Sequence, residues 1–300
     1  MRIIIGLLLI SCSFYAAACD ICGCAASGNQ LGILPQFQKH FIGISYLQSA
    51  YHSKPHDGIV DNKSETTERF QTLQFWGRAA IHKKVQVFAF IPYKYNVRSM
   101  NTGVSKLSGL GDMMILANMF VFNTTNQTKQ KVKHALQLGT GLKIPTGKSD
   151  VVQNGLMLHT NMQTGTGSYD IPFNLMYTLR YQSFGFNTEL NFTKNGTNKQ
   201  HFQFGNRTIA SMRFFAWKNW KKLTWLPSIG TTFEHAAMDQ QQEILQDFTG
   251  GNSVLGNGGI DLYYQSFGLQ LLFQQSVYEH LGNGYINNRP RWTATFIYLF

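Results

Sequence analysis

The feature that most constrains the fold of this chain is a repeated alternation of apolar and polar side chains. Successive residues of a strand point to opposite faces, so each alternating segment predicts a strand with one apolar face. About twelve segments show this pattern, separated by polar or glycine-containing stretches, and the chain is therefore predicted to be all-β. Their apolar positions are Ile42, Ile44 and Tyr46; Leu73, Phe75, Ala79 and Ile81; Val85, Val87, Ala89, Ile91 and Tyr93; Met113, Ile115, Ala117, Met119 and Val121; Leu136, Leu138, Leu142 and Ile144; Ile171, Phe173, Leu175, Tyr177 and Leu179; Phe184, Phe186, Leu190 and Phe192; Phe202, Phe204, Ala210 and Met212; Trp225, Ile229 and Phe233; Ile260, Leu262 and Tyr264; Phe267, Leu269, Leu271 and Phe273; and Trp292, Ala294, Phe296, Tyr298 and Phe300.

The composition favours strands that cross a membrane over strands of a soluble domain. Aromatic residues make up 14% of the chain, and charged residues also make up only 14%, against ~25% in typical soluble domains. No apolar run in the sequence approaches the ~20 residues that a spanning helix requires. Any membrane crossing must therefore use strands, and we expect a transmembrane antiparallel up-and-down β-barrel of about 12 strands.

The polar face of the alternating segments suits the water-filled lumen of such a barrel. This face is rich in charges and amides, at Gln137, Lys143, Arg180, Asn187, Glu189, Gln203, Arg207, Arg213, Glu234, Gln270 and Gln274. A soluble β-sandwich would expose a similar face to solvent, so the polar face alone does not separate the two folds. Trp, Phe and Tyr flank many of the segments, as in the aromatic girdles of membrane barrels, and this favours the barrel.

The connections between segments alternate in length, as in bacterial barrels with long outer loops and short periplasmic turns. Odd-numbered connections are long, at 51–68, 98–109, 145–167, 193–200, 235–257 and 279–290. Even-numbered connections are mostly tight, at 82–83, 182–183 and 265–266, although 123–133 and 216–223 are longer. With an even number of strands, both chain ends are expected on the periplasmic side.

The N-terminus has the pattern of an export signal. Arg2 supplies positive charge, residues 3–10 form a short apolar run, and residues 16–18 offer a small-residue cleavage site. We expect residues 1–18 to be a signal peptide, residues 19–39 a periplasmic cysteine-containing segment, and residues 40–300 the barrel. The predicted location is the outer membrane of a Gram-negative bacterium.

All four cysteines precede the predicted barrel, and three of them form the first candidate site. Cys19, Cys22 and Cys24 fall within six residues, and thiolates this close can bind one soft metal ion such as Cu(I) or Zn(II). In an oxidising compartment, Cys19 and Cys22 could instead form a disulfide. Cys19 also follows small residues, so acylation of its thiol is a third interpretation.

Charged residues on the inner face form the second candidate site. The alternation directs six cations and three acids toward the lumen, at Lys94, Arg98, Lys143, Arg180, Arg207 and Arg213, and at Glu189, Glu234 and Asp261. The excess of cations agrees with the net charge of +11 and predicts a weak preference for anions. The alternative is a network of internal salt bridges and hydrogen bonds that fills a narrow barrel.

Two features resemble known outer-membrane proteins. The closing segment ends on Phe300, as the closing strand of bacterial outer-membrane barrels does, where the terminal Phe belongs to the signal for the barrel assembly machinery. Three blocks resemble the barrels of the MetA pathway of phenol degradation family, often labelled simply as transporters. These blocks are Leu110-Gly111-Asp112, Leu138-Gly139-Thr140-Gly141-Leu142-Lys143-Ile144-Pro145-Thr146-Gly147 and Gln163-Thr164-Gly165-Thr166-Gly167-Ser168. The resemblance implies a barrel that passes or binds small hydrophobic or aromatic compounds.

The residues of these blocks also have a purely structural interpretation. Gly139 and Gly141 fall on the inner face, where missing side chains permit sharp curvature or leave space in the bore, and we favour curvature. Pro145 is expected to end its strand, because proline cannot donate a hydrogen bond to the ladder.

Together these patterns predict a monomeric channel or transporter for small, hydrophobic or aromatic solutes. Its expected partners are outer-membrane lipid, the solute and the barrel assembly machinery, and no nucleic-acid-binding motif is present in the sequence. The alternative is a barrel-anchored surface protein that binds Cu or Zn through its cysteines. An outer-membrane enzyme is less favoured, because loop histidines such as His52 and His159 belong to no catalytic motif that we identify.

Overall fold

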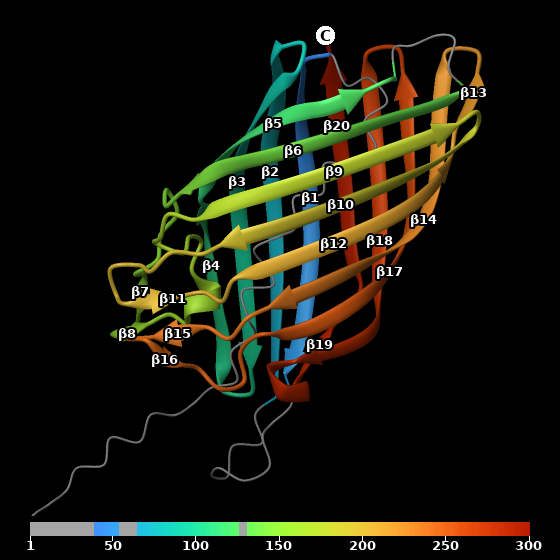
Figure 1. Ribbon diagram of the computed structural model, residues 1–300. Coiled ribbons are helices and arrows are strands. Elements are labelled where there is room, and N and C mark those ends of the chain that lie inside the picture. Colours follow the sequence, from blue (N-terminus) through green and yellow to red (C-terminus); the bar gives the residue numbers. More distant parts are fainter. Residues whose placement is uncertain (1–38, 54–64, 126–130) are drawn as a thin grey trace, which may run out of the picture.

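The computed structural model describes residues 39–53, 65–125 and 131–300, which form a closed antiparallel β-barrel (Figure 1). Twelve long strands, each paired with its neighbours in sequence order, make up the wall. They are β1 Phe41–Ser53, β2 Thr66–His82, β3 Val85–Met100, β5 Met113–Asn123, β6 Val132–Ile144, β9 Ile171–Tyr181, β10 Phe184–Lys194, β12 Arg207–Ala216, β14 Leu223–Ala236, β17 Gly251–Tyr264, β18 Phe267–Leu281 and β20 Arg291–Leu299. The predicted fold class and strand number are confirmed.

Strand β20 closes the wall, because it pairs with β18 on one side and with β1 on the other. Phe41 at the start of β1 lies opposite Leu299 at the end of β20, and the N–H of Phe300 donates to the carbonyl of His40 at 3.0 Å. A closed wall satisfies strand backbone groups without an exposed edge, which is the requirement for crossing lipid with strands. Within the described residues, no helix is both long and apolar enough to span a membrane.

The outward face of the wall is apolar, as the alternation predicts. Ile44, Phe296 and Leu269 lie side by side on β1, β20 and β18 and remain 43%, 50% and 39% exposed. Other exposed apolar residues of the wall include Phe75, Ile115, Leu138, Phe173, Phe214 and Phe233. Such a continuous apolar surface matches the band that membrane barrels present to lipid.

Shorter elements gather at the end of the barrel opposite Phe300 (Figure 1). Strand β4 (Gly103–Leu110) pairs with the outer part of β3, and β19 (Ile286–Asn288) pairs with β1 and β18. The hairpin β7 (Val152–Gln153) and β8 (Leu156–Met157) precedes a 3-10 turn at Thr160–Met162, and a second 3-10 turn spans Gly282–Gly284. A three-stranded sheet joins β11 (Phe202–Gln203), β15 (Gln240–Gln241) and β16 (Ile244–Leu245), whereas β13 (Lys218–Trp220) pairs with β14 near the Phe300 end.

The eighth predicted strand is wrong in its first half. Phe202 and Phe204 are not wall residues but lie buried in the loop region, because β11 pairs with β15 and not with the wall. The backbone N–H of Gly205 donates to Asp239 at 2.7 Å, and the wall strand β12 begins only at Arg207. Two predicted loops are also too long, since residues 98–109 contain the β3–β4 hairpin and β17 already begins at Gly251. Outside the lipid band a strand has no need of an apolar face, so alternation does not reveal it.

The inner face is not uniformly polar, because an aromatic core fills the lumen at the Phe300 end. Its buried members are Phe41, Trp76, Phe88, Phe90, Leu116, Met176, Phe215, Leu226, Tyr263, Ile297 and Leu299. Phe41 meets Trp76 edge-on at 4.6 Å between ring centroids, and Trp76 stacks on Phe90 at 5.8 Å. Aromatic pairs at these separations contribute about 0.5–1.5 kcal/mol each beyond burial. The predicted charged and amide-rich inner face is therefore interrupted by this core, although Arg78 still lies 5.0 Å over the Phe41 ring and Gln270 donates to the Tyr263 hydroxyl at 2.8 Å.

Strand β5 approaches closely at two inward glycines of β6. A Cβ added at Gly141 would lie 2.0 Å from the carbonyl oxygen of Ile115, and one at Gly139 would lie 1.9 Å from the side-chain oxygen of Asn118. Both contacts are far inside van der Waals distance, so strand β5 approaches closely only because these side chains are missing. A side chain at either glycine would meet β5 atoms and not open bore, and curvature as their role stays a prediction. Strand β6 ends at Ile144, immediately before Pro145, as predicted.

Candidate functional site

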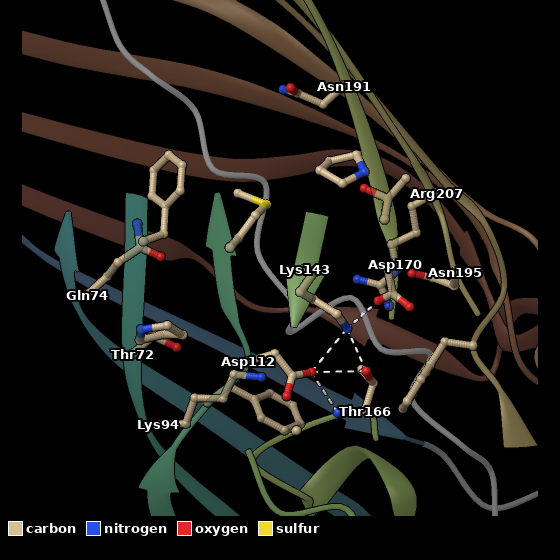
Figure 2. A pocket seen from close by; sticks show the side chains of 18 of the residues that line it. Thr72, Gln74, Lys94, Asp112, Lys143, Thr166, Asp170, Asn191, Asn195 and Arg207 are labelled. Carbon is tan, nitrogen blue, oxygen red and sulfur yellow. Dashed lines mark hydrogen bonds and ion pairs between the residues drawn. The ribbon is translucent and has the colours of Figure 1, made fainter. Parts of the chain in front are cut away.

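A cavity occupies the lumen between the aromatic core and the loop end of the barrel (Figure 2). It holds about 1420 Å³ of space outside protein atoms, including space open to solvent. Strands β2, β3, β5, β6, β9, β10 and β12 and the β6–β9 connection contribute its lining. The lining residues are Phe70, Thr72, Gln74, Phe90, Pro92, Lys94, Asn96, Asp112, Met114, Leu116, Lys143, Thr160, Asn161, Gln163, Gly165, Thr166, Asp170, Pro172, Asn174, Asn191, Thr193, Asn195, Phe204, Arg207 and Ile209.

The β6–β9 connection, residues 145–170, folds inward and covers part of this cavity. Met162 is fully buried, and its carbonyl accepts a hydrogen bond from the Asn96 side chain of β3 at 3.0 Å. The Gln163 amide ties the connection to itself, since it accepts from the N–H of Val151 at 3.1 Å and donates to the carbonyl of Leu158 at 3.0 Å. The connection is thus a packed part of the lumen and narrows it from the loop end.

Lys143 holds the base of this connection through a buried ion cluster (Figure 2). Its ammonium lies 3.1 Å from Asp112, donates to the Thr166 hydroxyl at 2.5 Å, and forms a second ion pair with Asp170. Asp170 also accepts from the Ser168 hydroxyl at 2.8 Å. One cation therefore forms ion pairs with two buried carboxylates, whose desolvation would otherwise be more costly.

Backbone groups complete the cluster around Asp112. Its carboxylate accepts from the N–H of Gly147 at 3.0 Å and from the N–H of Thr166 at 2.8 Å. A Cβ at Gly165 would lie 2.5 Å from the same carboxylate and 2.6 Å from Gly147, so the two segments meet this closely only as glycines. Burial alone would raise the pKa of Asp112, but Lys143 and the backbone donors hold that pKa below its ordinary value. The carboxylate therefore stays charged and keeps the connection in place.

The three sequence blocks on which the family resemblance rests thus meet at one ion cluster. Asp112 comes from the first block, Lys143 and Gly147 from the second, and Gly165 and Thr166 from the third. The alternation pattern predicts only curvature and strand ends for these blocks, and it does not point to Asp112 or Asp170 as site residues. The position of Asp112 next to Gly111, in a block already singled out, was the available signal.

The predicted lumen charges divide into separate groups. Lys94, Lys143 and Arg207 line the cavity together. Arg98 pairs with Glu68 at 3.4 Å. The Nη1 and Nη2 atoms of Arg291 donate to the Glu234 carboxylate at 2.7 and 2.9 Å. Glu68 was missed because it falls in the predicted loop 51–68. Arg291 was missed although it begins the closing segment, where alternation with Trp292 directs it inward.

The remaining predicted charges lie away from the cavity or within hydrogen-bond networks. Glu189 accepts hydrogen bonds from Asn174 at 3.4 Å and from Asn191 at 3.0 Å. Arg213 and Asp261 are buried, and Arg180 lies over the ring of Trp217 at 4.2 Å, near the Phe300 end. Many of the inward charged groups thus contact other protein groups. This agrees with the alternative of internal salt bridges and hydrogen bonds.

His159 caps the 3-10 turn at Thr160–Met162, where its Nδ1 accepts from the N–H of Asn161 at 3.4 Å. Burial, with a smaller contribution from the Arg98 cation, lowers the pKa of His159 from 6.5 to about 3. The ring is therefore neutral at neutral pH, which suits a structural cap.

Cys19, Cys22 and Cys24 lie outside the described residues. Within residues 39–53, 65–125 and 131–300, no group of three or more His, Cys, Asp or Glu side chains is placed to hold a metal ion. The cysteine site therefore stays a prediction from sequence.

Solved outer-membrane barrels share the fold of this chain. No family model and no curated protein matches the sequence. The crystal structure of the COG4313 outer membrane channel from Pseudomonas putida F1 superposes with a TM-score of 0.61 at 12% identity, covering 91% of this chain and 99% of that chain. The β-domain of the Bordetella autotransporter Brka superposes with a TM-score of 0.52 at 10% identity, covering 87% and 100%. The fold is that of an outer-membrane β-barrel. At these identities the similarity extends to the fold alone, and the family suggested by the three sequence blocks stays a prediction.

Proposed function

We propose that the protein is a passive outer-membrane channel for small solutes of hydrophobic or aromatic character, acting as a monomer. The observation that carries this proposal is the lumen cavity, which is lined from seven wall strands and bordered by the inward-folded β6–β9 connection. A barrel that served only as an anchor would have no need of such a cavity. The paired ends of β1 and β20 and the tight turns at the same end support a periplasmic position for that end.

The aromatic core is the barrier that a solute must pass between the cavity and the Phe300 end. Phe90 and Leu116 belong both to this core and to the cavity lining. The barrier is mostly apolar, with buried Arg78 over the Phe41 ring at 5.0 Å, and such a barrier favours solutes with an apolar surface over strongly hydrated ions. This arrangement supports hydrophobic or aromatic solutes over free passage of salts.

Planar-bilayer conductance and solute uptake by liposomes test the proposal. Phe90→Ala removes the ring at the junction of cavity and core, so we expect larger conductance and faster uptake of small aromatic solutes. Phe75→Ala removes an exposed ring from the outer face and serves as the matched control. Absence of conductance and uptake in both the wild type and Phe90→Ala would contradict a channel.

The cysteine-rich segment carries a second proposal, metal binding by Cys19, Cys22 and Cys24. Three thiols within six residues support it. Titration of the full chain with Cu(I) and Zn(II), beside Cys22→Ser/Cys24→Ser, tests it. Equal weak binding by the two proteins would end the metal hypothesis.

A further inference from the structure

Two cations that border the lumen cavity are left over after the internal ion pairs are assigned. Lys94 of β3 makes no hydrogen bond or ion pair with the residues that the structure describes. Arg207 of β12 has a buried Nε without a hydrogen-bond partner in the same part of the chain. Both side chains come from strands that face each other across the cavity in Figure 2.

The acids nearest to these cations are already engaged. Asp112, which acts on Lys94, accepts from Lys143, Thr166 and Gly147. Asp239, which acts on Arg207, accepts from the N–H of Gly205 at 2.7 Å. The cavity lining holds three cations, Lys94, Lys143 and Arg207, against two carboxylates, Asp112 and Asp170, so its net charge is three minus two, or +1.

Asn161 adds an uncharged polar group at the same cavity. Its side chain is 8% exposed, and neither the amide nitrogen nor the amide oxygen has a hydrogen-bond partner among the described residues. Buried polar groups are rarely left unmatched in folded proteins, and an unmatched amide that borders a cavity points to a ligand or water partner.

The other side of the cavity is apolar. Phe90, Met114 and Leu116 form the surface where the cavity meets the aromatic core. Phe90 and Lys94 lie on the same inward face of β3, four residues and therefore about 13 Å apart along the strand. Both residues line the cavity, so it offers one occupant an apolar surface and a cation.

From these contacts we infer that the cavity is a binding site for small organic monocarboxylates with an aromatic or compact apolar body. The carboxylate contacts Lys94 and Arg207, with Asn161 as an additional donor, and the apolar body contacts Phe90, Met114 and Leu116. A single surplus charge favours a monoanion over a dianion. The inference rests on the proposed channel function and specifies the class of solute.

Calorimetric titration of the full chain in detergent tests the site with benzoate as the probe. Benzamide has the same ring without the charge, acetate has the charge without the ring, and inorganic phosphate is a dianion. We expect benzoate to bind about tenfold or more tightly than each of these, since hydrogen bonds to a charged partner contribute more than neutral ones. Comparable binding of benzoate and benzamide would overturn the inference.

Lys94→Met and Arg207→Met should each weaken benzoate binding about tenfold while leaving benzamide binding unchanged. Lys194→Met is the matched control, because Lys194 is exposed on β10 directly after the cavity residue Thr193, and it should bind benzoate like the wild type. Heat-modifiable gel mobility verifies that each variant is folded. Lys94→Gln replaces Lys94→Met if the methionine variant does not fold. Wild-type affinity for benzoate in the folded Lys94 and Arg207 variants would contradict the site.

Conductance measured on the same proteins separates this inference from the channel proposal. Conductance without charge-dependent benzoate binding would contradict the carboxylate site and support the channel. Charge-dependent binding with neither conductance nor uptake removes the channel and leaves a carboxylate receptor.

Discussion

At the residue scale, Lys143 is the side chain on which the inward fold of the β6–β9 connection depends most. Lys143→Met would leave Asp112 and Asp170 buried without their cation. Breaking a buried pair in this way costs about 3–5 kcal/mol, so the connection should leave the lumen and become sensitive to protease. Lys148→Met, at an exposed position of the same connection, is the control. Limited proteolysis of the two variants checks the prediction, and equal cleavage rates would refute it.

The stability of the packed β6–β9 connection should depend on pH through two groups, His159 and Asp112. The pKa of His159 is lowered from 6.5 to about 3, and that of Asp112 is also lowered, so the packed connection binds fewer protons than a released one. Its stability is therefore complete above pH 6.5 and falls as the pH drops from there toward 3. The protection factors of residues 145–170, which correct hydrogen exchange for its slower intrinsic rate in acid, should be lower at acid pH than at pH 7.5. His159→Asn keeps a capping acceptor without titrating in this range and should flatten the dependence, whereas exposed His201→Asn should not.

At the element scale, the close approach of β5 to β6 depends on a missing side chain. Gly141→Ala places a methyl group 2.0 Å from the Ile115 carbonyl, so the two strands must separate locally. Overpacking of this kind costs about 1–3 kcal/mol. Gly258→Ala on β17 is the control, because its added Cβ meets no atom within 4 Å. The urea midpoint of each folded barrel measures the loss of stability. Equal midpoints for the two variants would show that β5 and β6 tolerate the methyl group at residue 141.

At the scale of the whole molecule, the outer apolar face defines how the barrel lies in a bilayer. Phe296 lies in the register between Ile44 and Leu269, so Phe296→Arg should cost about 2–4 kcal/mol in lipid vesicles. Val104 is exposed on β4 at the loop end, and Val104→Arg should change stability little. Unfolding by urea in vesicles compares them. A similar cost at both positions would place the lipid band elsewhere on the barrel.

The fold class, the strand number and the outward face follow from the alternation alone, because a strand that crosses lipid needs an apolar residue at every second position. It also selected Lys94, Lys143 and Arg207 as lumen residues, since they fall on the opposite face of the same alternation. Only the tertiary structure decided what fills the lumen. The sequence blocks marked the positions of Asp112 and Lys143, but no local pattern shows that these residues meet Asp170 or that an aromatic core forms, because the members come from strands and connections far apart in the chain. Closing the wall between β1 and β20 is the step that brings such residues together, and a period of two along one strand carries no information about its partners across the lumen.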